Sequence, residues 1–291
     1  MWIFLSLIQA IGISFEGVLQ KKSTLHFNEY IVTWCILAVS SIFYIPVLIG
    51  TGIPSHLDSA FWIAVVARLV VDSAALLFYI KALKHTNLSL AIPMMSFVPV
   101  FLIFVSFIVN HLFPTPIGIL GVIVVVFGVY LLNFDHDTKH ILSPFFAIRD
   151  DKGVRFMLLA AFLWSWVSAL QKLGIDHSNV TFYTSFFQPV WAILFFPLAF
   201  FSNRKEFMTI FHLKNLKMLF PIGGLDVIQT VAQNIAYTLA LPVYVTAVGS
   251  TNLLFASILG HYFFKEKVGN KIFPVVIIII GIVLLSIAQP T

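Results

Sequence analysis

Charged residues are scarce in this chain of 291 residues. Asp, Glu, Lys and Arg together make up 10% of the sequence, whereas a soluble domain of this size carries about 25%. Hydrophobic residues make up 60%, and the mean hydropathy is +1.00. This composition excludes an ordinary water-soluble globular protein and predicts a protein whose solvent is largely the bilayer.

Cysteine is almost absent, and metal-binding motifs are absent altogether. Cys35 is the single cysteine, so we expect no intrachain disulfide. The sequence contains no CxxC, HExxH or GxSxG motif and no Asp-rich metal loop, which argues against a zinc site and against an enzyme. We therefore expect no cofactor, no metal ion and no catalytic residue.

The basic residues are placed as in a membrane protein. The isoelectric point is near 9.3, a value that many nucleic-acid-binding proteins share. Here, however, Lys and Arg lie in short loops between apolar runs, so no nucleic acid is expected as a partner. Nearly all of them follow odd-numbered apolar runs. The positive-inside rule then places these loops in the cytoplasm and both termini outside.

Ten windows are long and apolar enough to cross a bilayer, which takes about 20 residues each. They cover 2–20, 30–50, 59–83, 88–110, 115–133, 155–174, 180–201, 217–240, 243–264 and 272–289. The first window has no basic residue before it and no small-residue cleavage site, so we interpret it as a retained helix. A charged, partly interfacial linker at 134–154 divides the chain into 1–133 and 155–291.

The two halves repeat each other. Gln20-Lys21 ends the first window and Gln171-Lys172 ends the sixth, while Gly128 aligns with Gly281 near the end of each half. Because each half has an odd number of helices, the second half must be inverted in the membrane. The sequence therefore predicts an all-α integral membrane protein with ten transmembrane helices in two inverted five-helix repeats, an arrangement known from secondary transporters.

Each half also carries a polar stripe, that is, a row of mainly polar residues along one face of a helix. The stripe positions are Arg68, Asp72, Ala75 and Tyr79 in the third window and Asp226, Thr230, Gln233 and Tyr237 in the eighth. Their spacing keeps each set on one helix face. Ionisable residues inside a membrane normally face a bundle interior or a water-filled cavity. The stripes thus predict two walls of one central cavity.

For several candidate cavity residues, a purely structural role explains the sequence pattern as simply as a role in substrate binding does. Glu16 in the first window is either a substrate or coupling residue or the partner of another polar group. Arg68 and Asp72 are four residues apart, which suits an intrahelical ion pair as well as a binding site. The remaining candidates are Trp164, Ser168, Gln229, Gln233, Asn234, Tyr237 and Ser250. For these the alternatives are helix packing and interfacial anchoring.

Aromatic and helix-breaking residues add two further expectations. An aromatic ring beside a carboxylate holds an ammonium group by cation–π attraction, so Trp164 and Asp72 favour a zwitterionic or cationic solute. Pro93 and Pro99 interrupt the fourth window, and Gly249 interrupts the ninth at the corresponding place. Matching broken helices indicate the moving part and the site, with ordinary kinks as the alternative.

These residues resemble the drug/metabolite transporter superfamily, EamA branch. The resemblance rests on the two five-helix units, on Tyr-x-x-Ala-Leu helix ends at Tyr79 and Tyr237, each followed by a broken helix, and on Phe264-Lys265-Glu266-Lys267 before the last window. It implies a secondary transporter of a small organic metabolite in the cell's inner or plasma membrane. Members of the family usually have both termini in the cytoplasm, opposite to the charge pattern here.

The resemblance also bears on the first helix. Small multidrug members of the superfamily use a glutamate there as a shared proton and substrate site. The corresponding position in this chain is Ser14, and Glu16 is two residues away. That role is therefore not transferred to Glu16.

Other functions fit the same pattern. A lipid or lipid-linked-metabolite translocator also needs a polar and aromatic groove, and a sugar or nucleotide-sugar transporter is a further alternative. The favoured interpretation is alternating-access transport of an amino-acid-like solute. The expected partners are a small-molecule substrate and membrane lipids, and both a monomer and a homodimer remain open.

Overall fold

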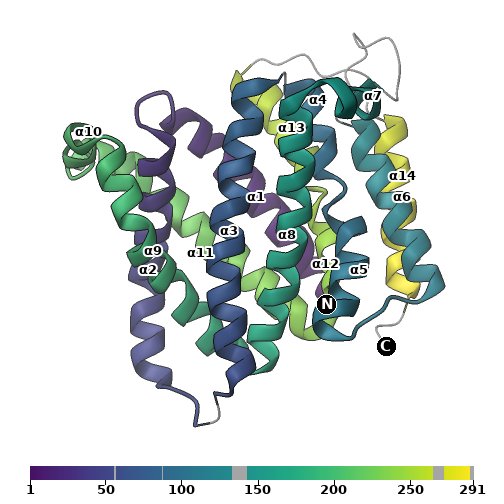
Figure 1. The fold of residues 1–291 in the computed structure, drawn as a ribbon, viewed down its shortest axis with the longest axis horizontal. Coiled ribbons are helices and arrows are strands. Elements are labelled where there is room, and N and C mark those ends of the chain that lie inside the picture. The colour runs from purple at the N-terminus through teal and green to yellow at the C-terminus, as the bar shows by residue number, and fades with distance from the viewer. Residues whose placement is uncertain (56, 87, 133–142, 265–271, 289–291) are drawn as a thin grey trace.

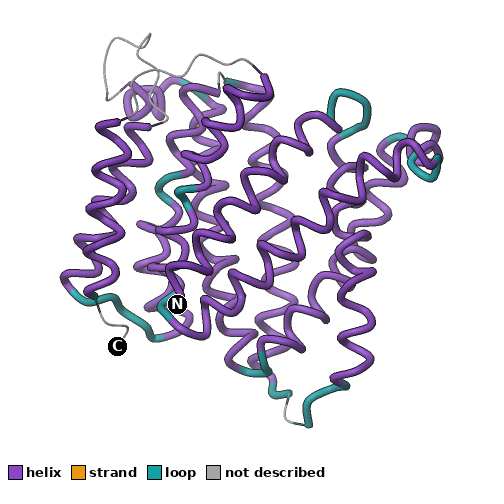
Figure 2. The backbone as a smooth tube through the Cα atoms, turned by 180° about the vertical axis from the view of Figure 1, so that it is seen from behind, coloured by secondary structure: helices purple, strands orange, loops and turns teal. Residues whose placement is uncertain are grey.

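The computed structural model describes residues 1–55, 57–86, 88–132, 143–264 and 272–288, which form a bundle of α-helices (Figure 1). Within these ranges there is no strand, and the tube in Figure 2 shows helices joined by short loops. The predicted all-α class is confirmed. The first part of the predicted linker and the Lys265-Glu266-Lys267 motif lie outside the described residues.

The helices follow the ten predicted windows. The first half contains α1 (Trp2–Ser23), α2 (Glu29–Thr51), α3 (Ser59–His85), α4 (Leu88–Met95), α5 (Val98–Asn110) and α6 (Pro116–Leu132). The second half contains α8 (Lys152–Asp176), α9 (Val180–Ser202), α10 (Arg204–Thr209), α11 (Leu213–Leu239), α12 (Pro242–Gly249), α13 (Asn252–Phe264) and α14 (Ile272–Ile287), and α7 (Ser143–Asp150) precedes it. The short helices α7 and α10 were not predicted.

Among the described residues, seven helical stretches are long and apolar enough to cross a membrane. They are Trp2–Ser23, Glu29–Thr51, Ser59–Ala82, Pro93–Asn110, Lys152–Asp176, Val180–Ser202 and Pro242–Gly260. Helices α6 and α14 are shorter apolar helices, and α11 is long but carries the second polar stripe. The start of α1 and the end of α14 lie at one end of the bundle, opposite α7 and α10 (Figure 1). The chain is therefore a multi-pass membrane protein.

Side-chain caps mark where several helices begin. Asn28, Asp58, Asp151 and Asn179 each precede a long helix, and each side chain accepts a hydrogen bond from a backbone N–H in the first turn. These N–H groups have no partner inside the helix, so the caps satisfy donors that would otherwise need water. The caps fix the starts of α2, α3, α8 and α9.

The fourth and ninth predicted spans are each divided into two helices. Ser96 and Phe97 separate α4 from α5, and Ser250 and Thr251 separate α12 from α13. Pro99 lies in the first turn of α5, where its missing N–H costs no helical hydrogen bond. Pro93 lies inside α4, and Gly249 is the last residue of α12. The breaks occupy corresponding places in the two halves, and their role in gating stays a prediction.

Helix packing follows a twofold pattern. In the second half, α8 is the counterpart of α1 and α11 is the counterpart of α3. Helix α3 packs along α8, and α1 packs along α11. Each of these two contacts is therefore the counterpart of the other. The same holds for α5 on α8 and α13 on α1. Helix α2 packs on its counterpart α9, and α6 packs on its counterpart α14. This is the contact pattern that two repeats about a pseudo-twofold axis produce.

The counterpart helices α6 and α14, which lie side by side at one edge of the bundle, run in opposite directions (Figures 1 and 2). A Cβ at Gly121 would lie 2.9 Å from Leu285, and one at Gly128 would lie 2.7 Å from Ile278. Residue numbers thus rise along α6 as they fall along α14. Because equivalent helices are antiparallel, the second repeat is inverted relative to the first. The glycines allow the close approach.

Candidate functional site

Asp72 of α3 lies in an aromatic environment between α3 and α8. The Trp164 indole nitrogen donates a hydrogen bond to Asp72 Oδ1 at 3.3 Å, and the ring centroids of Tyr79 and Trp164 are 5.3 Å apart. Asp72 is only 5% exposed. The structure therefore brings together three predicted residues, a carboxylate and two aromatic rings, at the interface of α3 and α8.

Arg68 lies one turn before Asp72 and is held by aromatic partners from α9. Its Nη1 donates to the Tyr183 hydroxyl at 2.8 Å, and its guanidinium carbon is 3.9 Å from the centroid of the Phe187 ring. Arg68 Nε is 3.8 Å from Asp72 Oδ2, close enough for an ion pair but too far for a hydrogen bond. Within the described chain this buried Nε has no hydrogen-bond acceptor. The predicted intrahelical pair is therefore present but leaves one N–H unused.

Amide side chains from α8 and α11 form a second group. Gln171 donates to Asn234 and, at 3.4 Å, to Gln233 Oε1. Asn234 in turn donates to Thr184 Oγ1 of α9 at 2.7 Å. These bonds join α8, α9 and α11, and they engage both the carbonyl oxygen and the NH₂ group of Asn234. For Asn234 this favours the interpretation as a helix-packing residue.

The second stripe continues from this group to α12. Gln233 Nε2 donates to the Tyr237 hydroxyl at 3.1 Å, and that hydroxyl lies 3.1 Å from Thr246 Oγ1. Ser168 donates to the Trp164 carbonyl of its own helix, and Ser250, which directly follows α12, donates to the Ala247 carbonyl of that helix.

Glu16 and Asp226 accept hydrogen bonds from the same nitrogen. Gln229 Nε2 donates to Glu16 Oε2 at 3.2 Å and to Asp226 Oδ1 at 3.1 Å. The other oxygen of Asp226 accepts from Gln188 Nε2 at 2.8 Å. Two carboxylates, one from each half of the chain, are thus joined by one amide.

The sequence reasoning missed the contribution of α9. Tyr183, Thr184, Phe187 and Gln188 all contact predicted site residues from this helix. Thr184 and Gln188 are four residues apart and share one face of a largely apolar helix. That spacing was a detectable signal for a third polar stripe.

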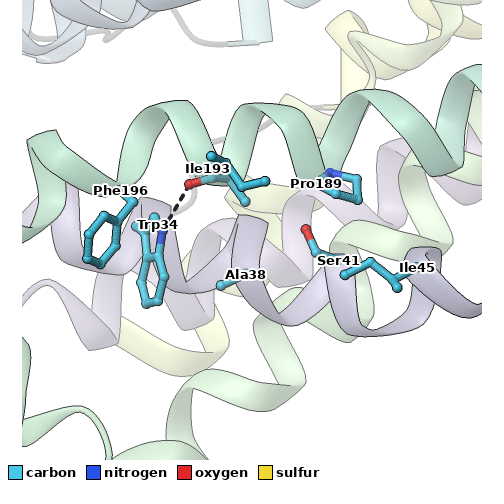
Figure 3. Close-up of a pocket in the computed structure, with 8 residues that line it drawn as sticks. Trp34, Ala38, Ser41, Ile45, Pro189, Ile193 and Phe196 are labelled. Carbon is cyan, nitrogen blue, oxygen red and sulfur yellow. Dashed lines mark hydrogen bonds between the residues drawn. The ribbon is translucent and has the colours of Figure 1, made fainter.

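A separate cavity of about 380 Å³ lies between α2 and α9 (Figure 3). It is lined by Trp34, Ala38, Ser41, Ile45, Pro189, Ala192, Ile193 and Phe196. The Trp34 indole donates to the Ala192 carbonyl at 3.0 Å and Ser41 donates to Leu37, so the lining is essentially apolar. Ile193 is 71% exposed, which places the opening on the outer surface of the bundle. None of the predicted cavity residues lines it.

Inverted five-helix repeats with polar residues between them are the architecture of a membrane transporter. The chain matches the EamA-like transporter family over residues 1–134 and 151–287. Because these ranges cover most of the chain, the protein belongs to the EamA-like transporter family, and the resemblance drawn from its sequence is confirmed.

Two similar proteins cover almost the whole chain. An uncharacterized transporter from Archaeoglobus fulgidus (strain ATCC 49558 / DSM 4304 / JCM 9628 / NBRC 100126 / VC-16) is 22% identical over 294 residues, covering 99% of this chain and 98% of that protein. A crystal structure described only as that of a protein superposes with a TM-score of 0.72 at 14% identity, covering 99% of both chains. At that identity the likeness shows a shared fold.

Proposed function

We propose that this membrane transporter moves an amino-acid-like, zwitterionic or cationic solute by alternating access, with the two repeats rocking about a central cavity. The family supports a transporter in general. The finer proposal depends on one observation: Asp72 is buried against Trp164 and within reach of Arg68, whose Nε has no hydrogen-bond acceptor in the described chain.

These groups suit the two charges of a zwitterion. The Trp164 ring with Asp72 would hold an ammonium group by cation–π and ionic attraction. The unused N–H of Arg68 would bind a carboxylate, because charge-assisted hydrogen bonds are the stronger ones. Arg68 and Asp72 are 3.8 Å apart, so each retains capacity for a new partner. A solute that bears both charges satisfies both residues.

A thermal-shift screen of the purified protein tests this proposal. The panel contains amino acids, primary amines, sugars and inorganic phosphate. A ligand at about 100 times its Kd stabilises the folded state by about 2.7 kcal/mol, which a melting curve detects. We expect amino acids or amines to raise the Tm of the wild type but not that of Asp72→Asn. The matched control is Asp176→Asn, because Asp176 pairs with Lys172 at the end of α8. Stabilisation by sugars or phosphate alone would contradict the solute class.

A second candidate is lipid translocation, and the cavity between α2 and α9 favours it. The cavity is apolar and opens on the outer surface of the bundle, where acyl chains lie. Movement of fluorescent phospholipid between the leaflets of vesicles, without uptake of any solute in the panel, would replace the first proposal with this one.

A further inference from the structure

We propose that Glu16 and Asp226 form a proton-binding site in which the two carboxylates hold one proton between α1 and α11. Its role in coupling a transport cycle rests on the proposed function, whereas the binding of the proton itself does not.

The hydrogen bonds around the pair are unequal. Asp226 accepts from Gln188 at 2.8 Å, from Gln229 at 3.1 Å and from Thr230 at 3.4 Å. Among the described residues, the one hydrogen bond that Glu16 accepts comes from Gln229. An amide NH₂ group has two hydrogens, and Gln229 uses one for each carboxylate. Hydrogen-bond donors favour the charged form of a carboxylate, so the negative charge belongs on Asp226 and the proton on Glu16.

The donors around the pair are uncharged. In the ranges that the structure describes, no lysine or arginine forms an ion pair with Glu16 or Asp226. From α2, the titratable side chain of Tyr44 interacts with Asp226, and its hydroxyl donates to the Val227 carbonyl at 3.4 Å. On α1 itself, Lys22 lies over the Phe263 ring of α13 at 4.2 Å. Two carboxylates without a cation are costly inside a membrane, and a proton removes one of the two charges.

The corresponding place in the other repeat carries a cation instead of a second acid. Arg68 occupies the stripe position that corresponds to Asp226, and Val167 corresponds to Glu16 in the alignment of Gln20 with Gln171. There the carboxylate of Asp72 is neutralised by Arg68. The acidic pair is therefore specific to one side of the pseudo-twofold arrangement, and a binding site for one proton follows from this asymmetry.

The pair also lies where the repeats meet. Helix α1 belongs to the first half and α11 to the second, and a Cβ at Gly12 would lie 2.8 Å from Gln229 Cβ, so the helices approach closely at the site. With the proton bound, Gln229 holds both acids and the helices together. Loss of the proton leaves two negative charges facing each other, which favours separation of α1 from α11. Proton binding is thereby linked to the relative position of the repeats.

Infrared spectroscopy of the reconstituted protein tests the site without any solute. We expect the wild type to show the C=O stretching band of a protonated carboxylic acid at about pH 7, where an ordinary Asp or Glu is ionised. Glu16→Gln and Asp226→Asn should each remove this band, and Asp176→Asn should leave it unchanged. A wild type without the band, or a band that persists in both variants, would overturn the proposal.

A chemical label provides a second test that needs no variant. Dicyclohexylcarbodiimide adds to protonated carboxylic acids in apolar surroundings, and peptide mapping by mass spectrometry locates the adduct. We expect the adduct on Glu16 or Asp226, with a yield that falls as the pH rises. Labelling only at other acids would overturn the proposal. Because neither experiment uses a transported solute, failure of the solute screen would reject the proposed function and leave these results standing.

Discussion

The indole N–H of Trp164 donates to Asp72 Oδ1 at 3.3 Å across the interface of α3 and α8. These helices come from different repeats, so the bond connects the two halves at the place where the proposed solute binds. A carboxylate whose partners are an aromatic donor and a loosely paired arginine remains free to exchange one of them for a ligand. Substitutions of Trp164 and Asp72 therefore test the proposed solute site most directly.

Trp164→Phe should weaken the binding of an ammonium-bearing solute. The change keeps an aromatic ring but removes the N–H that orients Asp72, and it weakens a cation–π contact worth about 0.5 to 2 kcal/mol. We expect Kd to rise by about 2- to 30-fold, measured by ligand-dependent thermal shift. The matched control is Trp191→Phe, because the buried Trp191 Nε1 has no hydrogen-bond partner in the described chain. Equal effects of the two changes would refute the orienting role of Trp164.

Arg68→Met should destabilise the fold strongly. It leaves Asp72 buried without its cation, and removing one partner of a buried ion pair costs about 3 to 5 kcal/mol. The double variant Arg68→Met/Asp72→Leu should recover most of this loss, because neither charge is then left unpaired. Chemical unfolding in detergent measures both variants. A double variant as unstable as the single one would show that the contacts of Arg68 with Tyr183 and Phe187, and not its charge, maintain the fold.

Gly281→Ala should loosen the contact between α6 and α14. The new Cβ would lie 2.6 Å from Val125 Cγ2 and 2.7 Å from the Val125 backbone nitrogen, so the helices must move apart. We expect a loss of about 1 to 3 kcal/mol in the free energy of unfolding. The control Gly17→Ala meets no atom within 4 Å and replaces a helical glycine, which should stabilise by up to about 1 kcal/mol. The same sign for both changes would contradict the close packing.

Asp58 should give the protein part of its sensitivity to acid. A hydrogen bond from the Phe61 backbone N–H, and then one with His177 at 2.6 Å, lower the pKa of Asp58 below its ordinary value of 3.8. A lowered pKa in the folded state contributes stability above about pH 4, and this is lost as the pH falls through the lowered value. Asp58→Asn keeps an oxygen to cap α3 but does not ionise. Its Tm should therefore decline less steeply than that of the wild type between about pH 5 and pH 3, and parallel curves would contradict the assignment.

Much of the fold followed from the sequence because the bilayer imposes simple rules. Apolar length located the ten spans, and the odd number of helices per half required the inversion that the antiparallel α6 and α14 now display. Pro99 and Gly249 located the two breaks to within a few residues. Helices α7 and α10 were missed because they are only 8 and 6 residues long, too short to produce a membrane-span signal.

The site was less predictable, because helical periodicity reveals which face is polar but not which helix it meets. Arg68 and Asp72 were recognisable as a pair since they lie on one helix. Glu16 was expected to need a partner, but its partner Gln229 lies 213 residues away in sequence. Such a contact depends on how α1 packs against α11, which no local pattern specifies.

The most direct measurement is uptake of radiolabelled amino acids and amines into liposomes that contain the purified protein, compared between the wild type and Asp72→Asn. We predict that the wild type accumulates at least one zwitterionic or cationic solute and that Asp72→Asn does not, although it folds and inserts equally well. Absence of uptake by the wild type across the panel, together with movement of phospholipid between leaflets, would contradict the proposed solute site.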